Sequence, residues 1–183
     1  MSVMEFVLVA HAIIVGLAVA EILRGFADLF RGDGAQVNYR LLLIATWTLL
    51  LLLQFWWSVW RIGDRESWTF AEFMALLLPV GILYLIARLC FPLVITGADL
   101  NAYYRGVARV IWCLVAATYA SFALLLQPFV FGGIIPSVLA SQVAIAVLAL
   151  IASQVTSPPF QVFVICLMLA QVLWRGLANI IGG

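Results

Sequence analysis

Six long apolar segments, separated by short polar breaks, constrain this chain more than any other feature of its sequence. Each is about 20 residues or longer, the length that an α-helix needs to cross roughly 30 Å of hydrocarbon. Of the 183 residues, 67% are hydrophobic and 9% are charged, whereas a soluble domain carries about a quarter charged residues. The alternating ten-residue stretches of a membrane β-barrel are absent from the sequence. The sequence therefore predicts an all-α, polytopic transmembrane helical bundle.

We expect a single transmembrane domain over residues 1–183, with turn-forming Gly, Asp, Ser and Pro residues at the breaks. The spans are expected at about 4–27, 40–61, 69–91, 103–127, 134–155 and 160–181. Asp99 is suited to cap the fourth helix. An alternative interpretation has five spans, with residues 128–137 in a re-entrant segment. The first span has no basic start and no small-residue cleavage site, so we interpret it as a retained helix rather than a signal peptide.

The distribution of arginine predicts the orientation of the chain. All nine basic residues are arginine, which suits a GC-rich bacterial genome. One side of the six-span arrangement collects Arg24, Arg31, Arg40, Arg88, Arg105 and Arg109, and the other collects Arg61, Arg65 and Arg175. The positive-inside rule makes the first side cytoplasmic, with Tyr39, Tyr103 and Tyr104 at its interface. Both termini are then periplasmic, in a multi-pass protein of the bacterial inner membrane.

The densest group of charged residues lies at the end of the first span: Glu21, Arg24, Asp28 and Arg31. Spacings of three and four place them on one helical face with alternating sign, where neighbours can pair. One interpretation is an ion ladder with which the helix leaves the membrane. The other adds Arg105 and Arg109, which share a face of the fourth span and need an anion. Glu21, Asp28 or an anionic lipid headgroup would serve, and the cluster would then be a polar gate or binding vestibule.

Two further polar side chains lie at membrane depth. His11 is the sole histidine, and it could support proton-coupled chemistry because histidine titrates near neutrality. The alternative is a neutral imidazole that is hydrogen-bonded to a facing Ser, Thr or Gln. Gln54 shares a stripe of the second span with Trp47, and we expect it to hydrogen-bond across a helix interface. The complete candidate path or gate comprises His11, Glu21, Arg24, Asp28, Gln54, Arg105 and Arg109.

The sequence carries no motif of a soluble enzyme. Walker, GxGxxG, HExxH, GxSxG and CxxC patterns are absent, and Cys90, Cys113 and Cys166 are too widely spaced for a disulfide framework or metal site. A charged cluster of alternating sign favours mutual neutralisation over acid–base catalysis. We therefore expect no catalytic residue, no cofactor, no metal and no nucleic-acid partner, and we regard an enzyme as disfavoured.

Several short runs are distinctive: Phe55 to Arg61, Trp68-Thr69-Phe70, Phe91-Pro92, Tyr103-Tyr104-Arg105, and Gly16-Leu17 through Leu23-Arg24-Gly25. Together they resemble a family of short six-helix bacterial membrane proteins, over roughly the first two-thirds of the chain. The resemblance implies a bacterial membrane protein of six helices. It brings no activity, ligand or catalytic residue with it.

Three functions fit these features, each with membrane lipid as a partner. The first is a small channel or transporter for an ion or small solute, because ionisable groups lie at membrane depth on several spans. Six helices in 20.1 kDa leave little room for a cavity, so we expect its pore between the protomers of a homo-oligomer. The second is a non-transporting accessory or assembly subunit of a larger membrane complex. The third is a lipid-handling protein that binds headgroups through Arg105 and Arg109.

Overall fold

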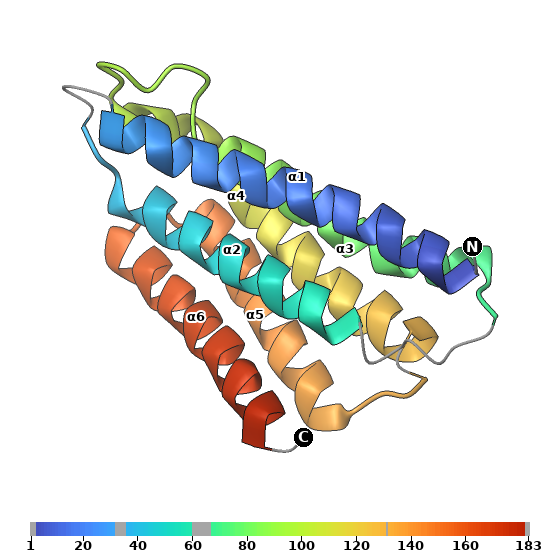
Figure 1. The fold of residues 1–183 in the computed structure, drawn as a ribbon. Helices are drawn as coiled ribbons and strands as arrows, with labels where there is room; N and C mark the ends of the chain where they lie inside the picture. The colour runs from blue at the N-terminus through green and yellow to red at the C-terminus, as the bar shows by residue number, and fades with distance from the viewer. Residues whose placement is uncertain (1–2, 32–35, 60–66, 131, 182–183) are drawn as a thin grey trace.

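The structure is a computed structural model, which describes residues 3–31, 36–59, 67–130 and 132–181 (Figure 1). Its elements are α1 (Val3–Arg31), α2 (Tyr39–Val59), α3 (Phe70–Leu89), α4 (Leu100–Ser121), η2 (Phe122–Val130), α5 (Pro136–Gln154) and α6 (Pro158–Ile181). With α4 and η2 counted as one span, six helical segments are long and apolar enough to cross a membrane. The prediction of an all-α transmembrane bundle is confirmed. Its orientation stays a prediction, and Arg61 and Arg65 lie outside the described residues.

The fourth span changes its helical type partway along. After Ser121 the chain continues as the π-helix η2, which contains Pro128. Proline lacks a backbone N–H, and its ring crowds the carbonyl four residues earlier, so a wider helical turn relieves the clash. The described part of residues 128–137 consists of the end of η2, a connection and the first turn of α5. The six-helix interpretation therefore replaces the five-span alternative.

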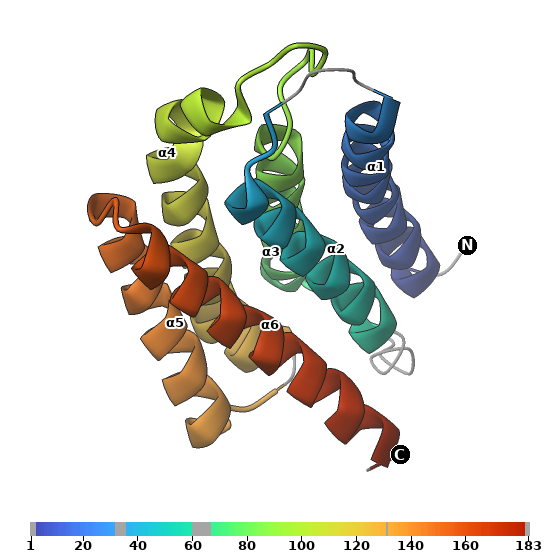
Figure 2. The same cartoon turned by 90° about the vertical axis from the view of Figure 1, so that its left-hand side faces the viewer.

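Five of the helical segments form a closed ring. α2 packs on α3, α3 on α4, α4 on α5, α5 on α6, and α6 returns to α2. α1 stands outside this ring and packs on α2 and α3 (Figure 2). The centre of the ring is filled by side chains of α2, α4 and α6, which meet across it. The helices of one chain thus surround a central axis that runs along the length of the helices.

The outward faces of the helices are apolar, whereas several uncharged polar side chains lie inside. Large residues such as Leu17, Val110 and Phe163 are more than half exposed. The buried polar residues include His11, Thr48, Thr118, Ser121, Gln127, Gln142 and Gln161. A soluble protein has the opposite arrangement, because its outside must be hydrated. This distribution is the one that hydrocarbon as solvent requires.

Two connections are fixed to each other at the end of the bundle where α2, α4 and α6 begin, which we call the arginine-rich end. Gln36 N–H donates to Ala98 O (3.1 Å), and Leu100 N–H donates to Gln36 O (3.1 Å). The predicted cap of the fourth helix is confirmed, since the Asp99 carboxylate accepts from the backbone N–H groups of Asn101 and Ala102. These bonds hold the first turns of α2 and α4 in a defined position.

Helix α1 packs closely against the α3–α4 connection at Gly25. A Cβ atom at this position would overlap the ring of Phe91, which is buried and packs edge-on against Phe26. We expect Gly25→Ala to lower the free energy of unfolding by about 1–3 kcal/mol, because the ring must shift in a packed site. Gly16→Ala on the same helix is the matched control, since a Cβ there meets nothing within 4 Å. It should be neutral or stabilising. Thermal unfolding in one detergent measures both, and equal midpoints would contradict this packing.

Candidate functional site

The predicted charge cluster on α1 is present, with one partner that sequence reasoning missed. Arg24 Nη2 donates to Glu21 Oε2 (2.9 Å), and Arg24 Nη1 donates to Asp28 Oδ2 (3.1 Å). The same Glu21 oxygen accepts from Arg88 Nη1 (3.0 Å) on α3. Glu21 therefore joins α1 to the ring, with its side chain 24% exposed. The available signal was depth, because Arg88 in the last turn of α3 and Glu21, about three turns before the end of α1, both lie toward the arginine-rich end.

Arg105 and Arg109 do not join this cluster. Both are exposed on α4 and make no hydrogen bond or ion pair within the part of the chain that the structure describes. The expected gate, in which Glu21 pairs with one of them, is not the arrangement found, because Glu21 is shared between Arg24 and Arg88. Their position suits anchoring in anionic headgroups, as the positive-inside rule describes.

A buried polar network fills the ring centre at the arginine-rich end. Gln161 Oε1 accepts from Tyr104 OH (2.8 Å) and from Arg40 Nη1 (3.0 Å). Gln161 Nε2 donates to the carbonyls of Ala152 and Val155. The Arg40 guanidinium also lies over the Tyr104 ring, 4.3 Å from its centre. Gln161, which lies on α6, thus connects this helix to α2, to α4 and to the C-terminal end of α5.

This buried network extends along α4 toward the middle of the bundle through Trp112, whose Nε1–H donates to Tyr104 OH (3.0 Å). Tyr104 was expected at the membrane interface, but it is 2% exposed. Its hydroxyl has partners on both sides, so burial leaves no polar group unsatisfied there. By contrast, Arg40 Nε is buried without a hydrogen-bond partner.

Two aromatic residues close the middle of the ring. Trp47 of α2 and Tyr119 of α4 stack with ring centres 6.0 Å apart, and they are 0% and 2% exposed. Neither Trp47 Nε1 nor Tyr119 OH has a hydrogen-bond partner. Tyr119 also meets Phe122 edge-on, and Phe122 meets Phe55. Orphaned buried polar atoms are rare in folded proteins, so this pair needs an explanation.

A third polar layer, after the Gln161 network and the Trp47–Tyr119 pair, lies nearer the opposite end of the bundle. Gln54 Nε2 donates to Val172 O of α6 (3.1 Å), which confirms the predicted bond across a helix interface. Arg175, three residues further along α6, is partly exposed. No hydrogen bond or ion pair holds Arg175 within the described residues.

His11 lies outside the ring, between α1 and α2. It is 1% exposed, and its ring meets Phe55 edge-on at 5.1 Å. The expected hydrogen bond to Ser, Thr or Gln is not found at Nε2, which is buried without a partner. Through Phe55 the imidazole touches the same run of rings that leads to Tyr119. His11 is thus a neighbour of the ring centre and not one of its lining residues.

Basic side chains outnumber acidic ones on helices α2 to α6. The residues of α2 to α6 include one acidic side chain, Glu72. Glu72 belongs to the first turn of α3, where it forms a capping box with Thr69. Arg88 is paired to α1, while Arg105 and Arg109 are exposed. Arg40 and Arg175 are the two remaining cations of these helices, and neither forms an ion pair with a carboxylate of the described residues.

A glutamine pair braces the wall of the ring at η2. Gln127 Nε2 donates to Gln142 Oε1 of α5 (2.6 Å), and Gln127 Oε1 accepts from Ile135 N–H (3.1 Å). Both glutamines are buried. The brace fixes the connection between η2 and α5 at the place where the π-helical turn weakens the regular helix.

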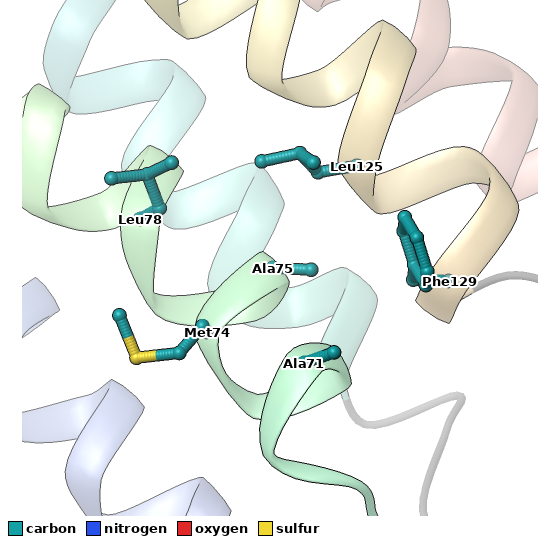
Figure 3. A pocket seen from close by; sticks show the side chains of 6 residues that line it. All are labelled: Ala71, Met74, Ala75, Leu78, Leu125 and Phe129. Atoms are coloured by element: carbon teal, nitrogen blue, oxygen red, sulfur yellow. The ribbon is translucent and has the colours of Figure 1, made fainter.

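An apolar pocket of about 180 Å³ lies between α3 and η2. Its lining residues are Ala71, Met74, Ala75, Leu78, Leu125 and Phe129. Figure 3 shows the small side chains of Ala71 and Ala75 pointing toward Phe129. Without polar groups in its lining, this pocket suits a hydrocarbon chain rather than an ion or polar solute.

Other chemistry has little support among the described residues. Burial raises the pKa of the Cys90 thiol to about 12, so it stays protonated at neutral pH and is a poor nucleophile. The described part of the chain contains no group of three His, Cys, Asp or Glu side chains that could hold a metal ion. The chain matches no protein-family model, no curated protein and no solved structure.

Proposed function

We propose that this protein is a small membrane transporter or channel, and that its solute route follows the centre of the five-helix ring. The observation that carries the proposal is the sequence of polar layers along that centre. Arg40, Trp47 and Gln54 recur every seven residues on α2, so successive layers lie about 10 Å apart. They contact Tyr104 of α4, Tyr119 of α4 and the backbone carbonyl of Val172 on α6, respectively.

The energetic cost of burying the polar side chains of these layers supports a role beyond structure. Lipid-facing helices gain nothing from burying arginine, tyrosine or tryptophan polar atoms without partners, since each unsatisfied group is unfavourable in a low-dielectric interior. A purely structural ring could be filled with Leu, Ile and Phe. The proposal differs from our sequence-based expectation of a pore between protomers, because the route lies within one chain.

The structure corresponds to a closed form under this proposal. Trp47, Trp112, Tyr104 and Tyr119 are nearly inaccessible and fill the centre. Opening requires movement of one wall, and η2 is the segment best suited to move. Its π-helical turns replace regular α-helical bonds, and it carries Phe122, which contacts Tyr119.

Trp47, which helps to fill the ring centre, gives a direct test of the proposed route. We expect Trp47→Leu to raise solute flux into proteoliposomes at least tenfold, because the smaller side chain no longer fills the gap between α2 and α4. Flux would be screened over small anions, cations and neutral solutes and over a range of pH. Trp57→Leu is the matched control, since Trp57 lies on the same helix but is 61% exposed on the outer face.

Two results would count against the route. One is an absence of flux for every solute, in the wild type and in Trp47→Leu alike. The other is an equal change in Trp47→Leu and Trp57→Leu, which would indicate leakage from a disturbed bilayer. Size-exclusion profiles of both variants must match the wild type for the comparison to hold.

A further inference from the structure

We propose that Arg105, Gly106 and Arg109 of α4 bind the phosphate headgroup of one anionic phospholipid, whose acyl chain lies along the outward face of the same helix. The inference goes beyond the proposed function and is independent of the solute route, because this face is exposed on the outside of the ring. It is carried by two exposed cations at the edge of the apolar span, with an uncovered glycine between them along the helix.

The buried network around Gln161 shows how deep these arginines lie. Gln161 accepts from Tyr104 OH (2.8 Å) and donates to Val155 O (3.1 Å), and Val155 is the C-terminal cap residue of α5. Tyr104 therefore lies level with the end of the apolar α5 span, and Arg105 is the next residue of α4. Arg109 lies one turn, about 6 Å, nearer the middle of the bundle. Arginine side chains at this level can extend to phosphates at the boundary of the hydrocarbon.

The two arginines have no partner in the part of the chain that the structure describes. Both are exposed, and neither belongs to an ion pair or a side-chain hydrogen bond of these residues. Asp99, the nearest acidic residue along the chain, accepts from two backbone N–H groups as the cap of α4. Like charges four residues apart on a helix repel each other, so an anion beside both of them is stabilising. The oxygens of a phosphate match the donor fork of a guanidinium.

Gly106 leaves space for a headgroup next to the helix backbone. A Cβ atom at this position would meet nothing within 4 Å. Arg105, Gly106 and Arg109 lie within about 100° of one another around the helix axis, so all three are on one outward face. A phosphate can therefore approach the backbone at Gly106 more closely than any larger side chain would allow. One guanidinium from each of the two turns can then reach it.

The same outward face continues as an apolar strip toward the middle of the bundle. Its exposed residues are Val110, Cys113, Ala117 and, in η2, Leu124. Cys113 and Ala117 have small side chains, which allow close approach to the helix. The face thus presents cations at headgroup depth and an apolar surface at the depth of the acyl chains. This is the order of polar and apolar groups along a phospholipid.

A second copy of this chain fits the face less well than a lipid does. Copies that are inserted in the same orientation would bring Arg105 and Arg109 of both chains together in a symmetric contact. Juxtaposed like charges oppose association. An anionic phospholipid instead supplies the opposite charge together with the apolar chain, so charge complementarity selects the lipid.

Lipid binding should appear as stabilisation of the purified protein. Phosphatidylglycerol replaces phosphatidylcholine stepwise in detergent micelles at constant total lipid and ionic strength, and the unfolding midpoint is followed. A ligand that binds only the folded state raises this midpoint in a saturable way. We expect a saturable rise with phosphatidylglycerol. Inorganic phosphate in lipid-free micelles should give none, because it lacks the acyl chain.

Variants locate the site. Arg105→Gln and Arg109→Gln should each raise the half-saturating fraction of phosphatidylglycerol about fivefold, since each removes one cation near the headgroups. Arg31→Gln is the matched control, because Arg31 is an exposed cation at the end of α1, and it should leave that fraction unchanged. Gly106→Leu keeps both charges but fills the space beside the backbone, so it should weaken binding severalfold. Gly16→Leu, at another position where a Cβ meets nothing within 4 Å, should not.

Several results would overturn the lipid site. Equal effects of Arg31→Gln and Arg105→Gln, or unchanged binding in Gly106→Leu, would mean that positive charge attracts anionic lipid without a defined site. An equal rise with inorganic phosphate would indicate a site for the free ion. A change of oligomer size in Gly106→Leu alone, measured by size-exclusion chromatography with light scattering, would indicate that a second copy covers this face. The flux measurements on Trp47→Leu test the transporter proposal separately.

Discussion

Replacement of Gln161 by leucine is expected to lower the free energy of unfolding by about 3–5 kcal/mol. The two side chains have similar volume, so the loss comes from hydrogen bonding rather than from a cavity. Tyr104 OH and Arg40 Nη1 would lose their acceptor, and the carbonyls of Ala152 and Val155 would lose their donor. Each buried polar group without a partner costs about 1–3 kcal/mol. Equilibrium unfolding in a fixed detergent mixture measures the change.

Two further variants make this expectation specific. Gln154→Leu should change stability by less than about 0.5 kcal/mol, since Gln154 is exposed at the same end of the bundle. Gln161→Glu keeps an acceptor for Tyr104 and Arg40 but cannot donate to the two carbonyls, so its loss should be intermediate. If Gln161→Leu and Gln154→Leu were equally stable, the network would not hold α2, α4 and α6 together.

The helices themselves were predictable because hydrocarbon imposes a simple rule. A backbone in lipid must satisfy its own hydrogen bonds, so long apolar runs become helices and their polar breaks become connections. Asp99 could be identified as a cap for a similarly local reason, since its carboxylate acts within three residues. The ion pairs of Arg24 with Glu21 and Asp28 were also within reach, because their spacing along one helix determines them.

The ring could not be predicted, because its contacts join residues far apart in the sequence. In a soluble helix the apolar stripe shows which side faces the core. In a membrane both the lipid and the core are apolar, so Leu53 on the outside and Leu52 on the inside look alike in the sequence. The ring that α2 to α6 form is therefore invisible to helical periodicity.

Emphasis on charge also directed attention away from the buried polar layers. Arg105 and Arg109 attract notice as a pair, yet the structure leaves them on the surface. Gln161 and Tyr119 carry no charge, yet they belong to the buried polar layers. In a low-dielectric interior an uncharged donor without a partner is as informative as an ion.

Reversal of the charge at Glu21 is also expected to lower the free energy of unfolding substantially. Glu21→Arg would place three guanidinium groups together, with Arg24 and Arg88 both deprived of their shared carboxylate. Removal of a partner from a buried ion pair costs about 3–5 kcal/mol. The arginines here are 39% exposed and can reach headgroups, so we expect about 2–4 kcal/mol. The loss should be visible as a lower unfolding midpoint and as weaker attachment of α1 to the ring.

The geometry predicts which second substitution restores stability. Arg88→Glu in the Glu21→Arg background exchanges the two charges across the α1–α3 contact, whereas Arg105→Glu introduces the same charge at an exposed site on α4. Arg88→Glu should recover at least half of the lost stability, because the pair joins two helices directly. Arg105→Glu should recover little, since Arg105 lies apart from the cluster. Equal recovery by both would mean that net charge at this end of the bundle, and not the Glu21–Arg88 pair, holds α1 in place.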